Sequence, residues 1–258
     1  MLPIDIQSQR DFRQVSISKV GVKGIKYPII VEDRTNTVQN TIADIDIFVD
    51  LHNEHRGTHM SRFLEVLNKF HKETIINNLE LLLTELKQQL KSETSFIKIS
   101  FPYFIEKEAP VTKLKSLMDY NCVFEAAMSD KFEFIIGVTV PVTTLCPCSK
   151  EISEYGAHNQ RSYITIKIIY NQFIWLEELI ELIEKSGSCE IYSLLKRPDE
   201  KYVTEKAYHN PVFAEDVVRD ITLKLKQDNR INWFCVEAEN IESIHNHNAY
   251  ALVESVKY

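Results

Sequence analysis

The stretch "TIADIDIFVDL", residues 41–51, decides the fold because it shows uninterrupted strand alternation. Successive side chains of an extended strand point to opposite faces of a sheet. One face of this stretch is entirely apolar and holds Ala43, Ile45, Ile47 and Val49. The other face is mixed and holds Ile42, Asp44, Asp46 and Phe48. The pattern predicts a β-strand whose apolar face is buried.

Working outward from this strand, hydrophobic periodicity predicts the remaining elements. The first half reads as strands 15–31 and 38–51 around a turn at 33–36, helices 61–70 and 73–92, and strands 95–105 and 112–128. The second half reads as strands 132–145 and 160–170, helices 173–185 and 215–227, and strands 231–239 and 244–256. A shorter helix is expected at 189–195, or continuing beyond Pro198.

The order of elements is therefore ββααββ twice, a duplication of pattern without a residue-by-residue repeat. We expect an α+β protein with an N-terminal arm at 1–15, a first repeat at 16–129 and a second repeat at 130–258. The two helices of each repeat are expected to cover one face of a four-stranded antiparallel sheet. The other face needs a partner, for which subunit association is the natural candidate.

Composition and charge exclude several classes of protein. No apolar run approaches the roughly 18 to 20 residues of a membrane helix. Residues 1–15 are polar and mixed in charge, unlike a secretory signal, so the expected location is the cytoplasm. A net charge of −7 argues against a general nucleic-acid binder, which needs a basic patch. Five cysteines, an odd number, favour reduced thiols, metal binding or catalysis over a disulfide framework.

The segment "TTLCPCSKEISEYGAHNQRS", residues 143–162, gathers reactive side chains. Cys146 and Cys148 would face the same way in an extended strand, and Pro147 is expected to end that strand. His158 follows on a polar segment with the donors Asn159, Gln160 and Arg161, which suit a polar or phosphorylated ligand. The alternatives are buried, small apolar cysteines and a merely solvated histidine.

Three other segments carry candidate residues. In "LKRPDEKYVTEKAYHNPVFAEDVVRD", residues 195–220, most acids should form a solvated helix face, but Glu215 could open a helix after Pro211. In "ESIHNHNAY", residues 242–250, His245 and His247 are expected on one face of a strand and suit a metal, or are exposed edge-strand residues. In "HRGTHMSRF", residues 55–63, Arg62 near a helix start suits an anion or is a surface residue beside a cap.

Taken in this order, these motifs closely resemble the type IB GTP cyclohydrolases of bacteria, within the GTP cyclohydrolase I family, over almost the whole chain from about residue 15. The resemblance implies the tunnelling fold (T-fold), in which two tandem ββααββ units per chain form antiparallel sheets that assemble into a barrel. It also implies a homotetramer with active sites between subunits. The implied reaction converts GTP and water into 7,8-dihydroneopterin triphosphate and formate, the first step of tetrahydrofolate synthesis and, in some bacteria, of queuosine synthesis.

The resemblance also implies a role for each matching residue. Cys146, His158 and Glu200 would be ligands of one divalent transition metal, either zinc, manganese or iron. His245 would be a further ligand or an acid–base group, and Cys148 and Glu242 would assist proton transfer beside the metal. Glu215 would bind the guanine edge. The candidates for the triphosphate are Arg62, Lys150 and Arg161.

Two alternatives remain open at this point. The first is a nitrile reductase of queuosine synthesis, which the resemblance places on the same fold and which uses a cysteine and NADPH. The second is a non-catalytic scaffold in which Cys146, His158 and Glu200 hold a structural metal. The chain carries no P-loop, dinucleotide-binding or G-x-S-x-G motif, so these other enzyme classes have no support in the sequence.

Overall fold

The computed structural model describes residues 7, 9–70 and 74–255. The chain divides into two compact units. Unit 1 comprises Met1–Pro102 and Val123–Ile135, and unit 2 comprises Tyr103–Cys122 and Ile136–Tyr258. The predicted repeats, 16–129 and 130–258, are defined by the order of elements along the sequence, whereas the two units are defined by compactness. The division into repeats therefore stays a prediction. The predicted arm at 1–15 lies partly outside the described residues.

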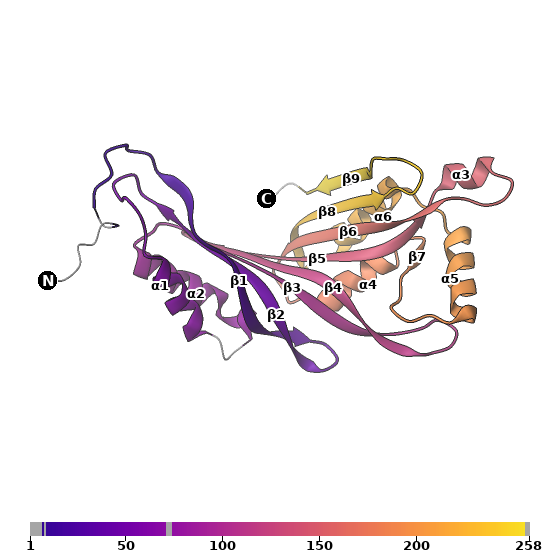
Figure 1. The fold of residues 1–258 in the computed structure, drawn as a ribbon, viewed down its shortest axis with the longest axis horizontal. Coiled ribbons are helices and arrows are strands. Elements are labelled where there is room, and N and C mark those ends of the chain that lie inside the picture. The colour runs from indigo at the N-terminus through magenta and orange to yellow at the C-terminus, as the bar shows by residue number, and fades with distance from the viewer. Residues whose placement is uncertain (1–6, 8, 71–73, 256–258) are drawn as a thin grey trace. The chain divides into compact units, whose positions relative to one another are not determined.

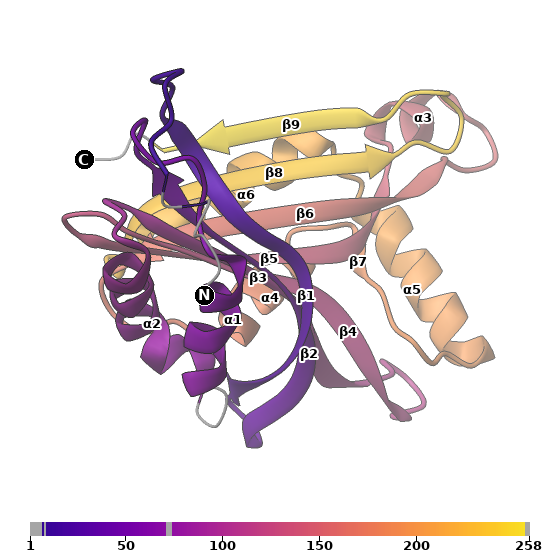
Figure 2. The same cartoon turned by 60° about the vertical axis from the view of Figure 1, so that its left-hand side comes forward.

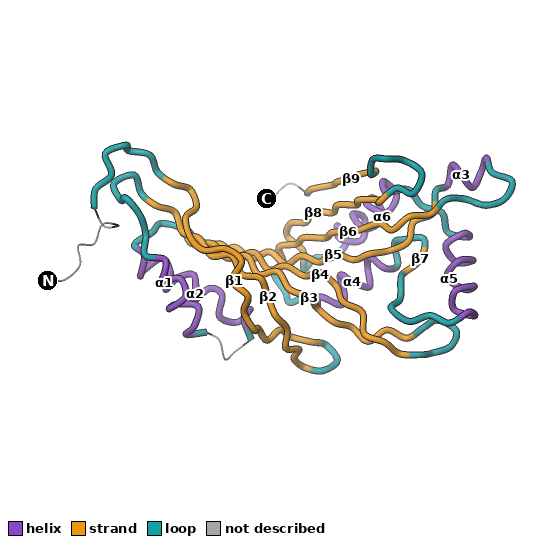
Figure 3. The backbone as a smooth tube through the Cα atoms, in the orientation of Figure 1, coloured by secondary structure: helices purple, strands orange, loops and turns teal. Residues whose placement is uncertain are grey.

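The strands of the described chain form one nine-stranded sheet with the order β1-β2-β3-β4-β5-β6-β8-β9, and β7 pairs with β5 (Figures 1 and 3). The strands are β1 Ile17–Asp33, β2 Thr37–Leu51, β3 Ser95–Glu108, β4 Lys115–Met128, β5 Phe132–Leu145, β6 Asn159–Tyr170, β7 Cys189–Glu190, β8 Ile231–Ile241 and β9 Ala249–Glu254. The pairs β1–β2, β2–β3, β5–β6, β6–β8 and β8–β9 are antiparallel.

The predicted tunnelling-fold barrel of two tandem units is wrong for this chain. The described strands form one sheet rather than two, and their order starts at β1 and ends at β9 without closing on itself. The physical reason is the length of the middle strands. β3, β4 and β5 each have 14 residues, and each contributes residues to both units. A repeat of elements along the sequence does not reveal that shared strands join both halves into one sheet.

In unit 1, β2 confirms the strand predicted for residues 41–51. Ala43, Ile45 and Ile47 have no exposed surface, and Val49 is 1% exposed. Helices α1 (Met60–Lys69) and α2 (Ile75–Leu90) pack against β1 and β2 (Figure 2). Their buried apolar residues follow the helical spacing and include Phe63, Val66, Leu79, Leu82, Leu83 and Leu86. The burial of both apolar faces against each other supplies the hydrophobic stabilisation of this unit.

The described residues of unit 2 form four helices, α3 (Pro147–Ile152), α4 (Leu176–Glu184), α5 (Arg197–His209) and α6 (Ala214–Gln227). Helix α6 packs against β8 and β9. The predicted helix start at Cys189 is wrong because Cys189 and Glu190 form β7, which pairs with Thr143 and Val142 of β5. The helix of this region, α5, starts at Arg197 and does continue beyond Pro198, as the second alternative expected. None of the helices in the described part of the chain is both long and apolar enough to cross a membrane.

The last strand is shorter than predicted. Instead of starting at residue 244, β9 starts at Ala249, and the intervening residues form a loop that we call the β8–β9 loop, residues 242–248. The loop is polar and largely exposed, so it has no buried face to hold it in a sheet. Val256, the end of the predicted strand, lies outside the described residues.

Candidate active site

Cys146 stands between a strand and a helix. Strand β5 ends at Leu145, and Pro147 is the first residue of α3, so the predicted strand end is confirmed. Proline suits this position because its ring presets the helical φ angle and its missing N–H would have no partner there. The Sγ atom of Cys146 accepts a hydrogen bond from the Ser149 backbone N–H at 3.4 Å and caps the helix.

The two cysteines therefore do not share a strand face, because the strand ends before Cys146. Cys148 lies within helix α3 and is exposed, whereas Cys146 is half-buried and capped by Ser149. A thiol that already accepts a backbone hydrogen bond is oriented before any ligand arrives. The structure thus gives the two thiols different environments, as a division of roles between them requires.

His158 lies next to Cys146 through the backbone. The Cys146 N–H donates to the His158 carbonyl oxygen at 3.1 Å and extends the β5–β6 ladder beyond its last pair, Leu145 and Asn159. The Ser149 hydroxyl donates to the Cys146 carbonyl oxygen and accepts from the His158 N–H, both at 3.2 Å. We call this arrangement of Cys146, Ser149 and His158 the Cys146–His158 corner. Ser149 was missed by sequence reasoning, because a serine in a first helical turn usually has only a local partner.

The segment before α6 is joined to the same strand end. The Val212 N–H donates to the Leu145 carbonyl oxygen at 3.1 Å. Helix α6 then starts at Ala214, and Glu215 is exposed in its first turn, which confirms the predicted position of this acid. Its neighbour Asp216 caps the helix by accepting from the Phe213 N–H at 3.2 Å. Of these two acids, Asp216 has a structural role that leaves Glu215 as the candidate for a ligand.

Glu200 lies on helix α5 as predicted, and its side chain is exposed. The C-terminal end of this helix is tied to α3, because Lys150 Nζ donates to the Tyr208 carbonyl oxygen at 2.6 Å and lies 4.6 Å from the Tyr208 ring centroid. Glu200 and Tyr208 are eight residues apart on α5, which is about 12 Å along the axis at ~1.5 Å per residue. Glu200 is thus at the end of α5 away from its link to α3.

The neighbour of Glu200, Asp199, has no exposed surface and fixes the start of α5. It accepts hydrogen bonds from the N–H groups of Val111 at 2.8 Å, Thr112 at 2.9 Å and Lys196 at 3.0 Å, and from the Thr112 hydroxyl at 2.6 Å. Burial raises the pKa of Asp199, but these hydrogen bonds outweigh burial and hold the pKa well below its usual range. Asp199 therefore anchors α5 to the turn between β3 and β4.

His245 and His247 lie in the β8–β9 loop and not on a strand, which corrects the prediction (Figure 3). Both are exposed, and their rings stack with centroids 5.1 Å apart and planes inclined by 18°. Glu242 starts the same loop directly after β8, whose last residue, Ile241, pairs with Arg161 of β6. Figures 1 and 2 both show this loop beside α3.

The three basic candidates lie in different surroundings. Arg62 belongs to unit 1 and donates to the Gln89 carbonyl oxygen at 2.9 Å, whereas Lys150 binds Tyr208 as described above. Arg161 lies in a pocket of about 350 Å³ in unit 2. This pocket is lined by polar and aromatic side chains that include Asp119, Asn121, Thr139, Tyr163 and Tyr192.

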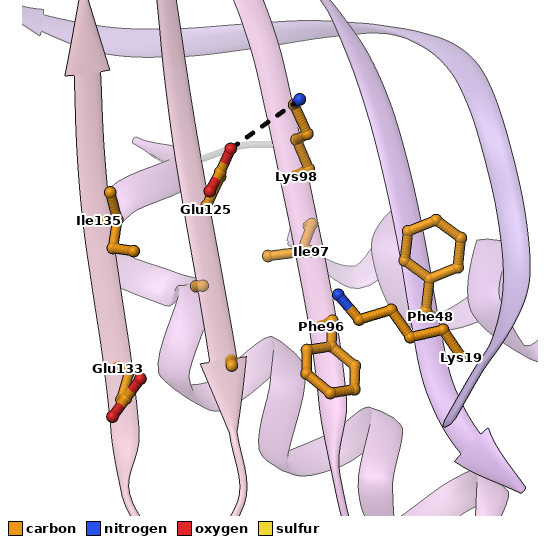
Figure 4. A pocket seen from close by; sticks show the side chains of 10 residues that line it. Lys19, Phe48, Phe96, Ile97, Lys98, Glu125, Glu133 and Ile135 are labelled. Atoms are coloured by element: carbon orange, nitrogen blue, oxygen red, sulfur yellow. Dashed lines mark ion pairs between the residues drawn. The ribbon is translucent and has the colours of Figure 1, made fainter. Parts of the chain in front are cut away.

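A second pocket, of about 290 Å³, lies in unit 1 and contains none of the predicted site residues (Figure 4). Its two lysines are already engaged. Lys19 Nζ lies 4.3 Å from the Phe96 ring centroid, and Lys98 Nζ is 3.9 Å from a carboxylate oxygen of Glu125. These contacts explain the mixed apolar and charged lining without a ligand.

The predicted metal ligands are brought together only in part. In the described ranges, no group of three or more His, Cys, Asp and Glu side chains is close enough to hold a metal ion. The Cys146–His158 corner still fits one, because a thiol and an imidazole are preferred zinc donors and the Ser149 N–H already orients the Cys146 thiol. The corner supplies two donors of the predicted set, while Glu200 and His245 are on exposed elements.

Solved structures with a similar fold include urate oxidases. The chain matches urate oxidase from Bacillus sp. TB-90 with a TM-score of 0.53 at 10% identity, covering 94% of this chain and 100% of that one. It matches a uricase from Bacillus fastidious with a TM-score of 0.52 at 9% identity, covering 92% and 93%. At this identity the likeness concerns the fold alone. In this chain the described strands form one sheet that runs from β1 to β9, and this sheet replaces the predicted barrel of tandem units.

Sequence relatives show the family. A profile of the family described as "Type I GTP cyclohydrolase folE2" matches residues 4–251. GTP cyclohydrolase FolE2 of Thermosipho africanus is 56% identical over 252 residues, covering 97% of each chain. GTP cyclohydrolase FolE2 of Citrifermentans bemidjiense is 55% identical over 250 residues, covering 97% of this chain and 94% of the relative. With a family match and identity of this extent, the chain belongs to the type I GTP cyclohydrolase FolE2 family.

Proposed function

We infer that this chain is a GTP cyclohydrolase of folate biosynthesis. It hydrolyses the imidazole ring of the guanine in GTP, releases formate and forms 7,8-dihydroneopterin triphosphate, the first step towards tetrahydrofolate. The observation that carries this inference is family membership over nearly the whole chain. The motifs at 143–162, 195–220 and 242–250 support its finer placement among the type IB enzymes.

We propose that a divalent transition metal, either zinc, manganese or iron, works at the Cys146–His158 corner. Cys146 Sγ and the imidazole of His158 would hold it, and Glu200 and His245 would complete the ligand set. When bound, such a metal makes hydroxide available near neutral pH. Cys146 is oriented for this role by the Ser149 N–H. Glu200 and His245 are exposed, which leaves them accessible for joining the set in the assembled enzyme.

Glu215 is proposed to bind the guanine edge. Its two carboxylate oxygens would accept hydrogen bonds from a ring N–H and from the exocyclic amine. The carboxylate is exposed in the first turn of α6, and the preceding segment is tied to the end of β5 beside Cys146. A negatively charged residue in a first helical turn is also favoured by the helix dipole. The fold thus supports Glu215 without requiring the carboxylate for its own stability.

The reaction needs proton transfers at several steps, for which we propose Cys148, Glu242 and His245. Cys148 is exposed on α3, and the other two lie in the β8–β9 loop beside it. Arg161 is the first candidate for the triphosphate, because it lies in a pocket. Lys150 and Arg62 are further candidates, and each would have to leave a backbone carbonyl that it now binds.

We further propose a cytoplasmic homotetramer with active sites between subunits. All five cysteines are free, which suits a reducing compartment. Exposed ligand candidates on α5 and in the β8–β9 loop suit a site that is completed by assembly. Measurement of the mass of the protein in solution by light scattering tests the tetramer. A monomer that is fully active at the same concentration would contradict it.

The function is tested by incubating the purified chain with GTP and each of the three metals, with and without a chelator. We expect formate together with a pterin that becomes fluorescent on oxidation, both lost with the chelator. NADPH consumption with a nitrile substrate, in place of formate release, would show the reductase. No formate release from the folded, metal-bound chain, together with unfolding when the metal is removed, would show a structural metal scaffold.

A further inference from the structure

The helix-facing side of the unit 2 sheet changes from apolar to polar towards the Cys146–His158 corner. On β6, Ile166 and Ile164 are fully buried, and the next residues on the same side are Ser162 and Gln160. Ser162 has no exposed surface and Gln160 is 8% exposed. Strand alternation puts His158 next in this row, beyond the first residue of β6. The row therefore leads from the hydrophobic core to the corner.

The polar residues of this row are joined by hydrogen bonds across β5 and β6. Gln160 Nε2 donates to Thr144 Oγ1 at 3.1 Å, and the hydroxyls of Thr144 and Ser162 are 2.6 Å apart. Thr144 has no exposed surface. Because the Nε2 atom of Gln160 donates to Thr144, the Oε1 atom of the same amide remains available to accept a hydrogen bond.

Two complementary atoms at the end of the row have no hydrogen-bond partner. They are Oε1 of Gln160 and Nδ1 of His158, and both are buried. A buried polar atom without a partner destabilises the folded state, because it has lost its hydrogen bonds to water, so such atoms are rarely left unpaired. An amide oxygen only accepts hydrogen bonds, whereas a neutral imidazole carries one N–H donor. Placing the ring proton on Nδ1 supplies the donor that Gln160 lacks.

We propose that Gln160 is a positioning residue for His158. Its Oε1 accepts the Nδ1 proton of His158 through one buried water molecule, which fixes the ring in a single tautomer and leaves Nε2 free to bind a metal. Neighbours on one side of a strand are about 6.5 Å apart along the chain, a span that two side chains and one water can bridge. Histidine ligands generally have their second nitrogen held in this way. The metal in this inference rests on the proposed function, whereas the tautomer of His158 is independent of that function.

The first test reads the tautomer directly in the metal-free protein. Histidine labelled with ¹⁵N is observed by long-range proton–nitrogen correlation at a pH where the imidazole is neutral, and the His158→Ala spectrum assigns the signal. We expect the Nδ1–H form in the unaltered chain and in Gln160→Glu, which keeps an acceptor. In Gln160→Leu we expect exchange between both tautomers. An unchanged Nδ1–H signal in Gln160→Leu would overturn the proposal.

The second test measures the affinity for zinc alone by competition with a chelating dye. We expect Gln160→Leu to bind zinc about 10–100-fold more weakly, the usual effect of losing such a support. The matched control is Thr222→Val, which removes a buried hydroxyl of α6 that also lacks a partner. Its zinc affinity should stay within about twofold, because nothing in the described structure links Thr222 to His158.

Folding failure does not rescue the proposal. If Gln160→Leu does not fold, Thr144→Val takes its place, because it removes the partner that holds the Gln160 amide. Exchange between tautomers in Thr144→Val then supports the proposal, and a fixed Nδ1–H form overturns it. The outcomes also separate this role from the enzyme function. If Gln160→Leu shows tautomer exchange but the unaltered chain releases no formate from GTP, only the proposed function fails. If the unaltered chain releases formate but Gln160→Leu keeps a fixed tautomer, only the positioning role of Gln160 fails.

Discussion

The Cys146–His158 corner and the β8–β9 loop both belong to unit 2, yet they are held in different ways. The corner is fixed by four hydrogen bonds among Cys146, Ser149 and His158. The loop has two exposed, stacked histidines, and its Asn248 is bound to Glu239 of β8 at 2.8 Å. One part of the proposed site is therefore organised by the fold, while we expect the exposed loop to adjust when substrate, metal or another subunit binds.

The most severe way to break this comparison is to remove a donor of the corner. We predict that Cys146→Ala lowers zinc affinity and formate release by at least about 100-fold, since even supporting residues cost 10–100-fold. The control is Cys189→Ala, because burial raises the pKa of the Cys189 thiol to about 11 and leaves it inert at neutral pH. Chelator competition and formate assays measure both. Equal losses in the two variants would show a general effect of cysteine removal.

The next variant separates the two thiols. Cys148 is exposed and does not cap α3, so Cys148→Ala should retain zinc binding. Turnover should fall about 100-fold, the lower end of what a positioned acid–base group contributes. Metal content after gel filtration and kcat with GTP measure the two properties. Loss of zinc equal to that of Cys146→Ala would contradict the division of roles.

Glu215 tests whether the start of α6 belongs to the substrate site. Glu215→Gln removes one or two hydrogen bonds to a charged group, each worth about 1.5–3 kcal/mol, so kcat/KM for GTP should fall at least about tenfold. Asp216→Asn is the matched control, because Asp216 caps the helix and pairs with Arg219 at 3.3 Å. It should lower Tm and leave KM unchanged. A raised KM in Asp216→Asn with a normal KM in Glu215→Gln would contradict the proposal, because Asp216 and not Glu215 would then bind the substrate.

Substitution of Asp199 tests whether this residue anchors α5 to the turn between β3 and β4. Its folded pKa is depressed, so it stabilises the fold above the ordinary aspartate pKa of about 3.9, and this contribution is lost as pH falls below that value. Asp199→Asn should lower Tm at neutral pH and make Tm fall less steeply between about pH 5 and pH 3. Calorimetry at several pH values measures this. Parallel pH profiles for both proteins would contradict the assignment.

The smallest effect is expected within the β8–β9 loop. His247 is exposed and, unlike His245, is not among the proposed ligands or acid–base groups, so His247→Ala should change kcat/KM by less than about threefold, the range of ordinary surface changes. His245→Ala should lower it by about 100-fold, as expected for an acid–base group. Steady-state kinetics of the pair sharpen the comparison with the corner. Equal losses would assign the chemistry to the stacked pair instead of His245.

Local patterns predicted much of this molecule. Alternation identified β2 with its buried Ile45 and Ile47, and Pro147 marked the end of β5. The failures have non-local causes. The two-residue strand β7 exists because it pairs with β5, and Asp199 is held by Val111, 88 residues earlier in the chain. The continuous sheet depends on strands shared by both units, which no periodicity reveals. In the β8–β9 loop, alternating histidines mimicked a strand that has no buried face.

The most direct test of the account is formate release from GTP by the unaltered chain and by His158→Ala at saturating metal. We expect formate and pterin in equal amounts from the unaltered chain, and we expect both to be lost with chelator and restored by added metal. His158→Ala should release at least about 100-fold less, because the corner would lose its imidazole donor. If the rate of formate release is unchanged both by the chelator and in His158→Ala, this would contradict the claim that the Cys146–His158 corner performs the chemistry.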